Sequence, residues 1–157
     1  MSLTIPGDWF VNPKVLGEFY SKYKTHPIEE IRKVSFEQGL AFGRSMKTQL
    51  GIAGDGIENV AEVLKAVLKD EPTAKITSLD RGRIMLRNSG FCPLMTACLS
   101  MNLPWTWLCS ALGWPFFHGL ASAVNAKVNL TMTKRREKGD PHCDHIFEIG
   151  EGRLILP

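Results

Sequence analysis

Apolar residues recur at helical spacing through the first half of the chain. Between residues 25 and 50 they return every three or four positions, with Pro27 early in the segment and Gly51 directly after it. This spacing predicts a long helix that begins near Pro27 and ends at Gly51. The same spacing predicts a short helix over residues 13–24 and a surface helix over 57–69.

The period changes to two residues in the second half. Residues 74–80 and 83–88 flank an Asp-Arg-Gly turn, and residues 128–133 alternate apolar with polar side chains, as do 143–149 after a Gly-Asp-Pro turn. This alternation predicts two antiparallel hairpins. The final segment, 152–157, could form an edge strand.

An apolar helix is predicted between the two hairpins, over residues 104–125, with a kink near Pro115. At the other end of the chain, residues 1–12 are interrupted by Pro and Gly, and we expect Trp9 and Phe10 to dock this arm onto the body of the protein. The order of elements fits a single α+β domain in which an antiparallel sheet packs against helices.

Composition and net charge argue against some classes of function. The chain has 157 residues, of which 44% are hydrophobic, and 19 basic against 16 acidic residues give a net charge of +3, which is too small to favour nucleic-acid binding. The most apolar region, 91–124, is broken by polar residues, Gly and Pro, so no membrane span is expected. Four cysteines without Cys-x-x-Cys spacing, and a start without signal-peptide features, indicate reduced thiols in the cytoplasm.

A His-Cys-Asp-His cluster precedes the last predicted strand. If Cys143 begins that strand, Cys143 and His145 share one face and Asp144 points to the other. Cys143 and His145 could serve a metal, with Cys109 as the natural further ligand. The alternatives are a buried structural thiol, which is common for free cysteine, and a catalytic thiol.

Aromatic residues of the predicted apolar helix are candidates for a ligand pocket. Trp114, Phe117 and His118 could supply its wall and its polar group, although aromatic residues of a buried helix are also ordinary core. His118 could orient a ligand or make an internal hydrogen bond. The charged run 134–138 is expected to be a solvated hairpin tip, with an anionic partner as the alternative.

The assembled pattern resembles the 4-vinyl reductase domain, which is grouped with haem-NO-binding and TRAPP-like proteins. The resemblance covers residues 37–151, through Cys109, the helix segment GWPFFHGLASAVNAK, and Gly139-Asp140-x-x-Cys143 before an alternating strand. It implies an N-terminal arm with helices over 1–36 and a ligand-binding α+β fold over 37–157. The C-terminal element is also similar to that of the 2-amino-thiazoline-4-carboxylic acid hydrolase family.

The resemblance also implies where a zinc site would lie. Zinc-bearing members of the group carry a helix cysteine, a Glu-x-x-Cys on the penultimate strand, and a cysteine after the turn. Cys109 and Cys143 match the outer two positions, whereas Met132 and Arg135 stand at the middle ones. Zinc would then need further ligands, for which the candidates are His145 and His118.

Three classes of function follow as hypotheses. The leading one is a binding or sensor protein for a small apolar or aromatic molecule, with Trp114, Phe117 and His118 at a pocket between helices and sheet. The second is an enzyme, either a hydrolase of a cyclic amidine-like substrate that uses Cys143 and His145 or a protein of tetrapyrrole vinyl reduction. The third is a structural adaptor that dimerises through helix faces, and a homodimer is also compatible with the sensor.

Overall fold

Helices and one antiparallel sheet make up the computed structural model, which describes residues 3–9 and 12–150. The helices are α1 (Val15–Tyr23), α2 (Ile28–Leu50), α3 (Ile57–Val67), α4 (Pro93–Met101), α5 (Trp105–Leu108) and α6 (Trp114–Ser122), with a π-helical turn, η1 (Cys109–Gly113), and a 3₁₀ turn, η2 (Arg136–Lys138). The strands are β1 (Ala74–Asp80), β2 (Arg83–Asn88), β3 (Val128–Lys134) and β4 (Cys143–Ile149), in the order β1-β2-β4-β3. The predicted α+β class is therefore confirmed.

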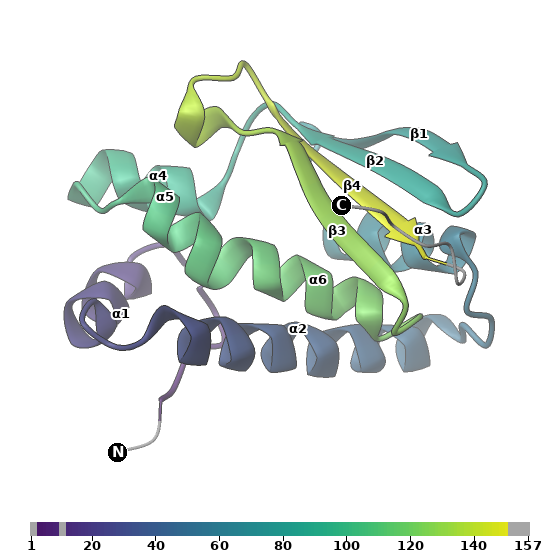
Figure 1. Cartoon of the computed structure of the whole chain (residues 1–157), viewed down its shortest axis with the longest axis horizontal. Coiled ribbons are helices and arrows are strands. Elements are labelled where there is room, and N and C mark those ends of the chain that lie inside the picture. Colours follow the sequence, from purple (N-terminus) through teal and green to yellow (C-terminus); the bar gives the residue numbers. More distant parts are fainter. Residues whose placement is uncertain (1–2, 10–11, 151–157) are drawn as a thin grey trace.

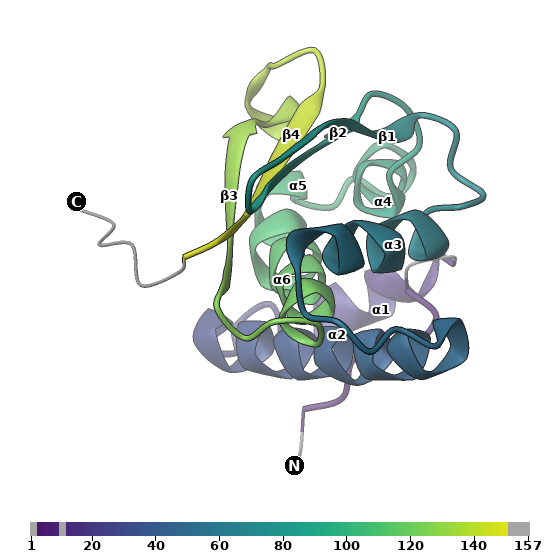
Figure 2. The same ribbon diagram turned by 90° about the vertical axis from the view of Figure 1, so that its right-hand side faces the viewer.

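The elements stack in layers. Figure 1 shows α6 lying along α2, with the strands on the other side of α6. In the turned view of Figure 2 the sheet arches over α3 and α6, and α2 lies beneath them. Among the described residues, no helix is both long enough and apolar enough to span a membrane.

The predicted bounds of the first helices and of the hairpins agree with the structure. α2 ends at Gly51, whose positive φ of 67° closes the helix, and Gly82 turns the first hairpin with a φ of 68°. Both positions suit glycine, which adopts this backbone conformation without steric strain. The edge strand predicted at 152–157 and the docking of Phe10 lie outside the described residues. Trp9 is buried, and its indole N–H donates to Gln38 Oε1 at 3.0 Å.

Close packing of α2 on α6 depends on glycines that face the partner helix. A Cβ placed on Gly39 would collide with the carbonyl oxygen of Phe116, and a Cβ on Gly119 with that of Phe36. Because the obstacles are backbone atoms, they cannot rotate away. The two helices can therefore lie against each other only where side chains are missing.

The helix predicted over 104–125 is present as α5, η1 and α6, with a π-helical turn just before Pro115. The Trp114 N–H donates to Cys109 O, five residues back, and Pro115 has no N–H to offer. The carbonyl of Ser110 is thereby left without a helical partner. Arg32 of α2 satisfies it, since its Nη1 donates to Ser110 O at 2.7 Å. The widened turn is thus supported from the neighbouring helix.

The two faces of β4 are divided as the alternation predicts. His145 and Phe147 face the helices, whereas Asp144 lies on the other face, where both of its oxygens accept hydrogen bonds from Arg87 at 2.8 and 2.9 Å. The adjoining turn differs from expectation. It is not a wholly solvated charged tip, because the Glu137 side chain is only 1% exposed and forms an ion pair with Arg135.

Candidate functional site

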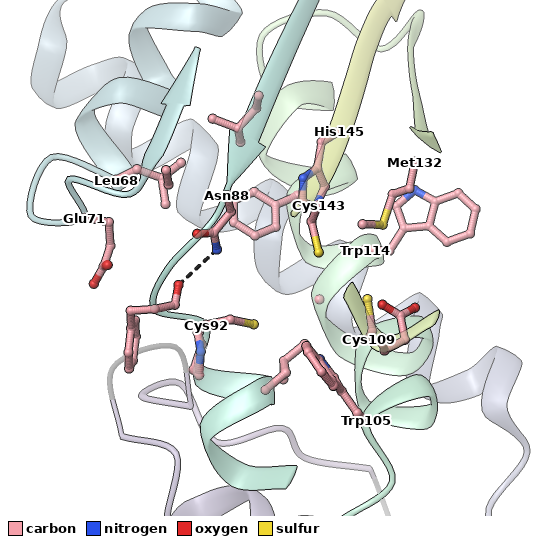
Figure 3. Close-up of a pocket in the computed structure, with 18 residues that line it drawn as sticks. Leu68, Glu71, Asn88, Cys92, Trp105, Cys109, Trp114, Met132, Cys143 and His145 are labelled. Carbon is pink, nitrogen blue, oxygen red and sulfur yellow. Dashed lines mark hydrogen bonds between the residues drawn. The ribbon is translucent and has the colours of Figure 1, made fainter. Parts of the chain in front are cut away.

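A partly open cavity of about 70 Å³ lies between the sheet and the helical segments α4, α5 and α6. Its wall is mainly apolar. The side chains that matter most for its shape are Leu86, Leu94, Trp105, Trp114, Phe117 and Met132. Figure 3 shows Trp105 on the helical side and Met132 with Trp114 at one edge of this space. Strands β2, β3 and β4 close the opposite side.

Cysteine thiols from different elements point into the cavity. Cys92 precedes α4, Cys109 begins the π-helical turn, and Cys143 begins β4; all are free, and their sulfur atoms face the same space in Figure 3. Burial raises the pKa of Cys92, and it raises the pKa of Cys109 to about 12 with a further contribution from the charge of Glu137. These two thiols are therefore protonated at neutral pH and act as weakly polar wall atoms.

His145 is the polar ring of the cavity. It lies beside Phe117, with ring centroids 5.7 Å apart, and stacks over Phe147 at 6.4 Å. Burial lowers the pKa of His145 to about 4, against a smaller opposing effect of the Leu86 backbone, so the ring is neutral at physiological pH. Its Nδ1 is buried and has no hydrogen-bond partner among the described residues. The imidazole thus presents an unused hydrogen-bonding atom inside an apolar enclosure.

The turn between β3 and β4 brings charge to the edge of the cavity. Glu137 lines it from η2 while paired with Arg135, so the two charges neutralise each other. The backbone N–H of Arg136 donates to Cys143 Sγ at 3.3 Å, which fixes the position of that thiol.

The structure brings together most of the residues that the sequence suggested. Trp114 and Phe117 line the cavity, and Trp114 is held by its indole N–H, which donates to Leu130 O at 3.2 Å, and by Arg32, which lies 5.2 Å above its ring. His118 does not line it. Its Nε2 lies 2.9 Å from Val128 O, which matches the internal hydrogen bond that was one of the two interpretations drawn from the sequence. The polar ring of the cavity is His145 instead.

The suggested metal ligands Cys109, Cys143 and His145 all border the cavity. Within residues 3–9 and 12–150, however, no group of three or more His, Cys, Asp or Glu residues is arranged to hold a metal ion. The other two positions of the zinc pattern do not help, since Met132 offers a thioether and Arg135 a cation. The residues as arranged do not fit a zinc site.

A hydrolytic arrangement would need an activated nucleophile beside its base. Cys143 and His145 share a face, but Asp144 lies on the opposite face of β4, where Arg87 is the main cause that lowers its pKa and His142 lies 3.4 Å away. Asp144 is therefore buried and paired with Arg87 on the face of the sheet away from the cavity. It does not orient His145.

Sequence reasoning missed Cys92 and Glu137 as cavity residues. Pro93 was the available signal for the first of these, because proline favours the first turn of a helix and Cys92 precedes it as the N-cap of α4. Trp105 was among the helix aromatics that could line a pocket, and it does line the cavity. No local signal placed Glu137, since its burial depends on Arg135 and on the packing of η2 against α5.

Comparison with known proteins finds no family model and no curated protein that matches the chain. The chemistry of the site is therefore argued from its geometry. Neutral thiols, a neutral imidazole and aromatic walls offer burial and one or two hydrogen bonds. Such a combination suits the binding of an uncharged or apolar group.

Proposed function

We propose that the protein binds a small apolar or aromatic molecule, or the apolar part of one, in the cavity between the helices and the sheet, as a binding or sensor protein. Apolar burial supplies affinity in such sites, and a few polar atoms supply orientation. The walls formed by Trp105, Trp114 and Phe117 support this proposal, as do the uncharged thiols beside them. The sensor role implied by the resemblance to the 4-vinyl reductase domain agrees with it and stays a prediction.

The unpartnered Nδ1 of His145 carries the proposal. Buried polar atoms in folded proteins are almost always hydrogen-bonded, because an unsatisfied one destabilises the fold by about 1–3 kcal/mol. His145 Nδ1 is buried without a partner and borders a cavity. A ligand with one hydrogen-bonding group would satisfy this atom while its apolar part fills the space between the rings.

The size of the cavity restricts the ligand. Its volume is about 70 Å³, and an apolar cavity of about 150 Å³ is known to hold a benzene molecule. A complete aromatic ring therefore needs a small outward shift of the wall, or the ligand must continue into space that adjoins the cavity. Cys92 and Phe117 in the wall are only partly buried, so the wall has room for such an outward shift.

Thermal unfolding with small probes tests the proposal. We expect phenol and toluene to raise the melting temperature of the protein, because a ligand that binds only the folded state stabilises it. Met132→Trp should remove the effect by filling the cavity from β3. Thr131→Trp is the matched control, since Thr131 is exposed on the opposite face of the same strand. Equal shifts in the two variants, or no shift in the unchanged protein, would overturn the proposal.

A further inference from the structure

The cavity adjoins a surface groove between α3 and β1. Leu68, Glu71, Ala74 and Leu86 line both spaces, and the groove has a volume of about 380 Å³. In Figure 3, Leu68 and Glu71 stand on the side of the cavity that lies away from Cys109 and Trp114. The cavity and the groove are therefore neighbours that share these side chains as a common wall.

Lysine side chains line the outer part of this groove. Lys65 of α3, Lys69 in the turn after α3 and Lys75 of β1 line it around an apolar floor, and Glu71 is the one carboxylate among its described lining residues. Each lysine is exposed, and none forms an ion pair within the described part of the chain. Long lysine side chains can lie along an apolar surface while their ammonium groups stay in water. The groove therefore offers an apolar path that ends in positive charge.

A second groove that adjoins the cavity has the opposite character. It shares Glu71 and Phe91 with the cavity, and Asp8 and Asp70 also line it, with no cationic residue among the described residues of its wall. An anionic group would be repelled there. The two grooves that adjoin the cavity thus differ in charge, and of the two only the groove between α3 and β1 has lysines along its wall.

We propose that the ligand is an elongated amphiphile whose apolar end occupies the cavity and whose anionic head lies at Lys65 and Lys69. This inference rests on the proposed function and names its ligand class, a medium-length alkyl or aryl chain that carries a carboxylate. The chain passes between Leu68 and Leu86, where the two spaces meet. The carboxylate of Glu71 repels the anionic head group and so weakens its binding.

Calorimetric titration with octanoate and 1-octanol, which share one chain length and differ in charge, tests this inference. We expect the double variant Lys65→Gln with Lys69→Gln to weaken octanoate binding about fivefold, because two exposed charge pairs are lost, and to leave 1-octanol binding unchanged. Glu71→Gln should tighten octanoate binding. Added salt should weaken the binding of octanoate alone.

The matched control is the double variant Lys22→Gln with Lys24→Gln, which removes the same charge from the last turn of α1 and the residue that follows it. α1 lies at the opposite end of the molecule from α3 (Figure 1). Octanoate should therefore bind this double variant as tightly as it binds the unchanged protein. An equal loss in both double variants, or octanoate binding that is insensitive to both, would overturn the inference. If toluene stabilises the protein while octanoate does not bind, the inference fails and the proposed function stands.

Discussion

At the scale of single residues, the site depends on groups that burial keeps uncharged. Charged imidazolium and thiolate are disfavoured when they are removed from water, which lowers the pKa of a histidine and raises that of a cysteine. His145 and Cys109 both follow this rule, with pKa values near 4 and 12. These two groups of the cavity wall therefore stay neutral across the physiological range of pH.

The neutrality of His145 should be visible as a pH dependence of stability. The unfolded chain takes up a proton near pH 6.5, whereas the folded chain does so only near pH 4, so the unfolded state binds more protons between these values. Stability should therefore fall as the pH is lowered through this window. His145 alone should reduce the free energy of unfolding by about 2 kcal/mol between pH 7 and pH 5.

Urea unfolding of His145→Phe measures this contribution. The variant lacks the titrating group, so its free energy of unfolding should fall less between pH 7 and pH 5 than that of the unchanged protein. The control is His26→Gln, at the surface beside Glu30, which retains His145 and should retain its pH dependence. Parallel curves for His145→Phe and the unchanged protein would show that His145 is protonated equally in both states.

At the scale of elements, the sequence predicts helices and strands wherever one face is apolar and the other polar. α2, α3 and both hairpins have such faces, and their predicted ranges agree with the structure. α4 was not predicted, because residues 93–101 are apolar on nearly every side and show no period. The π-helical turn was also missed, since it depends on Arg32, a residue 78 positions away from the carbonyl that it satisfies.

The packing of α2 on α6 gives a test at this scale. Glycine-to-alanine exchange within a helix normally stabilises it by about 1 kcal/mol. Gly39→Ala should instead destabilise the protein by about 3 kcal/mol, because the new methyl group would collide with the backbone of Phe116. Gly17→Ala is the control in α1, where the nearest atom is the flexible Met101 Sδ at 3.2 Å. Chemical denaturation that showed both variants equally stable would contradict this account.

At the scale of the whole molecule, the core consists of two hydrophobic clusters. One joins α1, α2 and the α5–α6 helix, and the other joins α3 to the sheet; Phe117 packs against both. The sequence identified Trp114, Phe117, Cys109, Cys143 and His145 as candidates, but periodicity does not show which elements meet. These residues line one cavity together with Cys92 and Glu137, and only the tertiary packing shows this.

The position of Phe117 between the clusters leads to a prediction about the cavity itself. Phe117→Ala should destabilise the protein by about 3 kcal/mol, because it removes packing from both clusters and enlarges the cavity. The enlarged cavity should admit an aromatic ring more readily than the original one. Toluene should therefore raise the melting temperature of Phe117→Ala more than that of the unchanged protein.

Thermal unfolding of Phe117→Ala and Phe42→Ala, with and without toluene, separates cavity filling from a general solvent effect. Phe42 is 45% exposed and also contacts Phe116, but it does not line the cavity, so toluene should stabilise this variant only as much as the unchanged protein. An equal response of both variants would place toluene outside the cavity. A larger response of Phe117→Ala alone requires that the space between the two clusters can hold an apolar ligand.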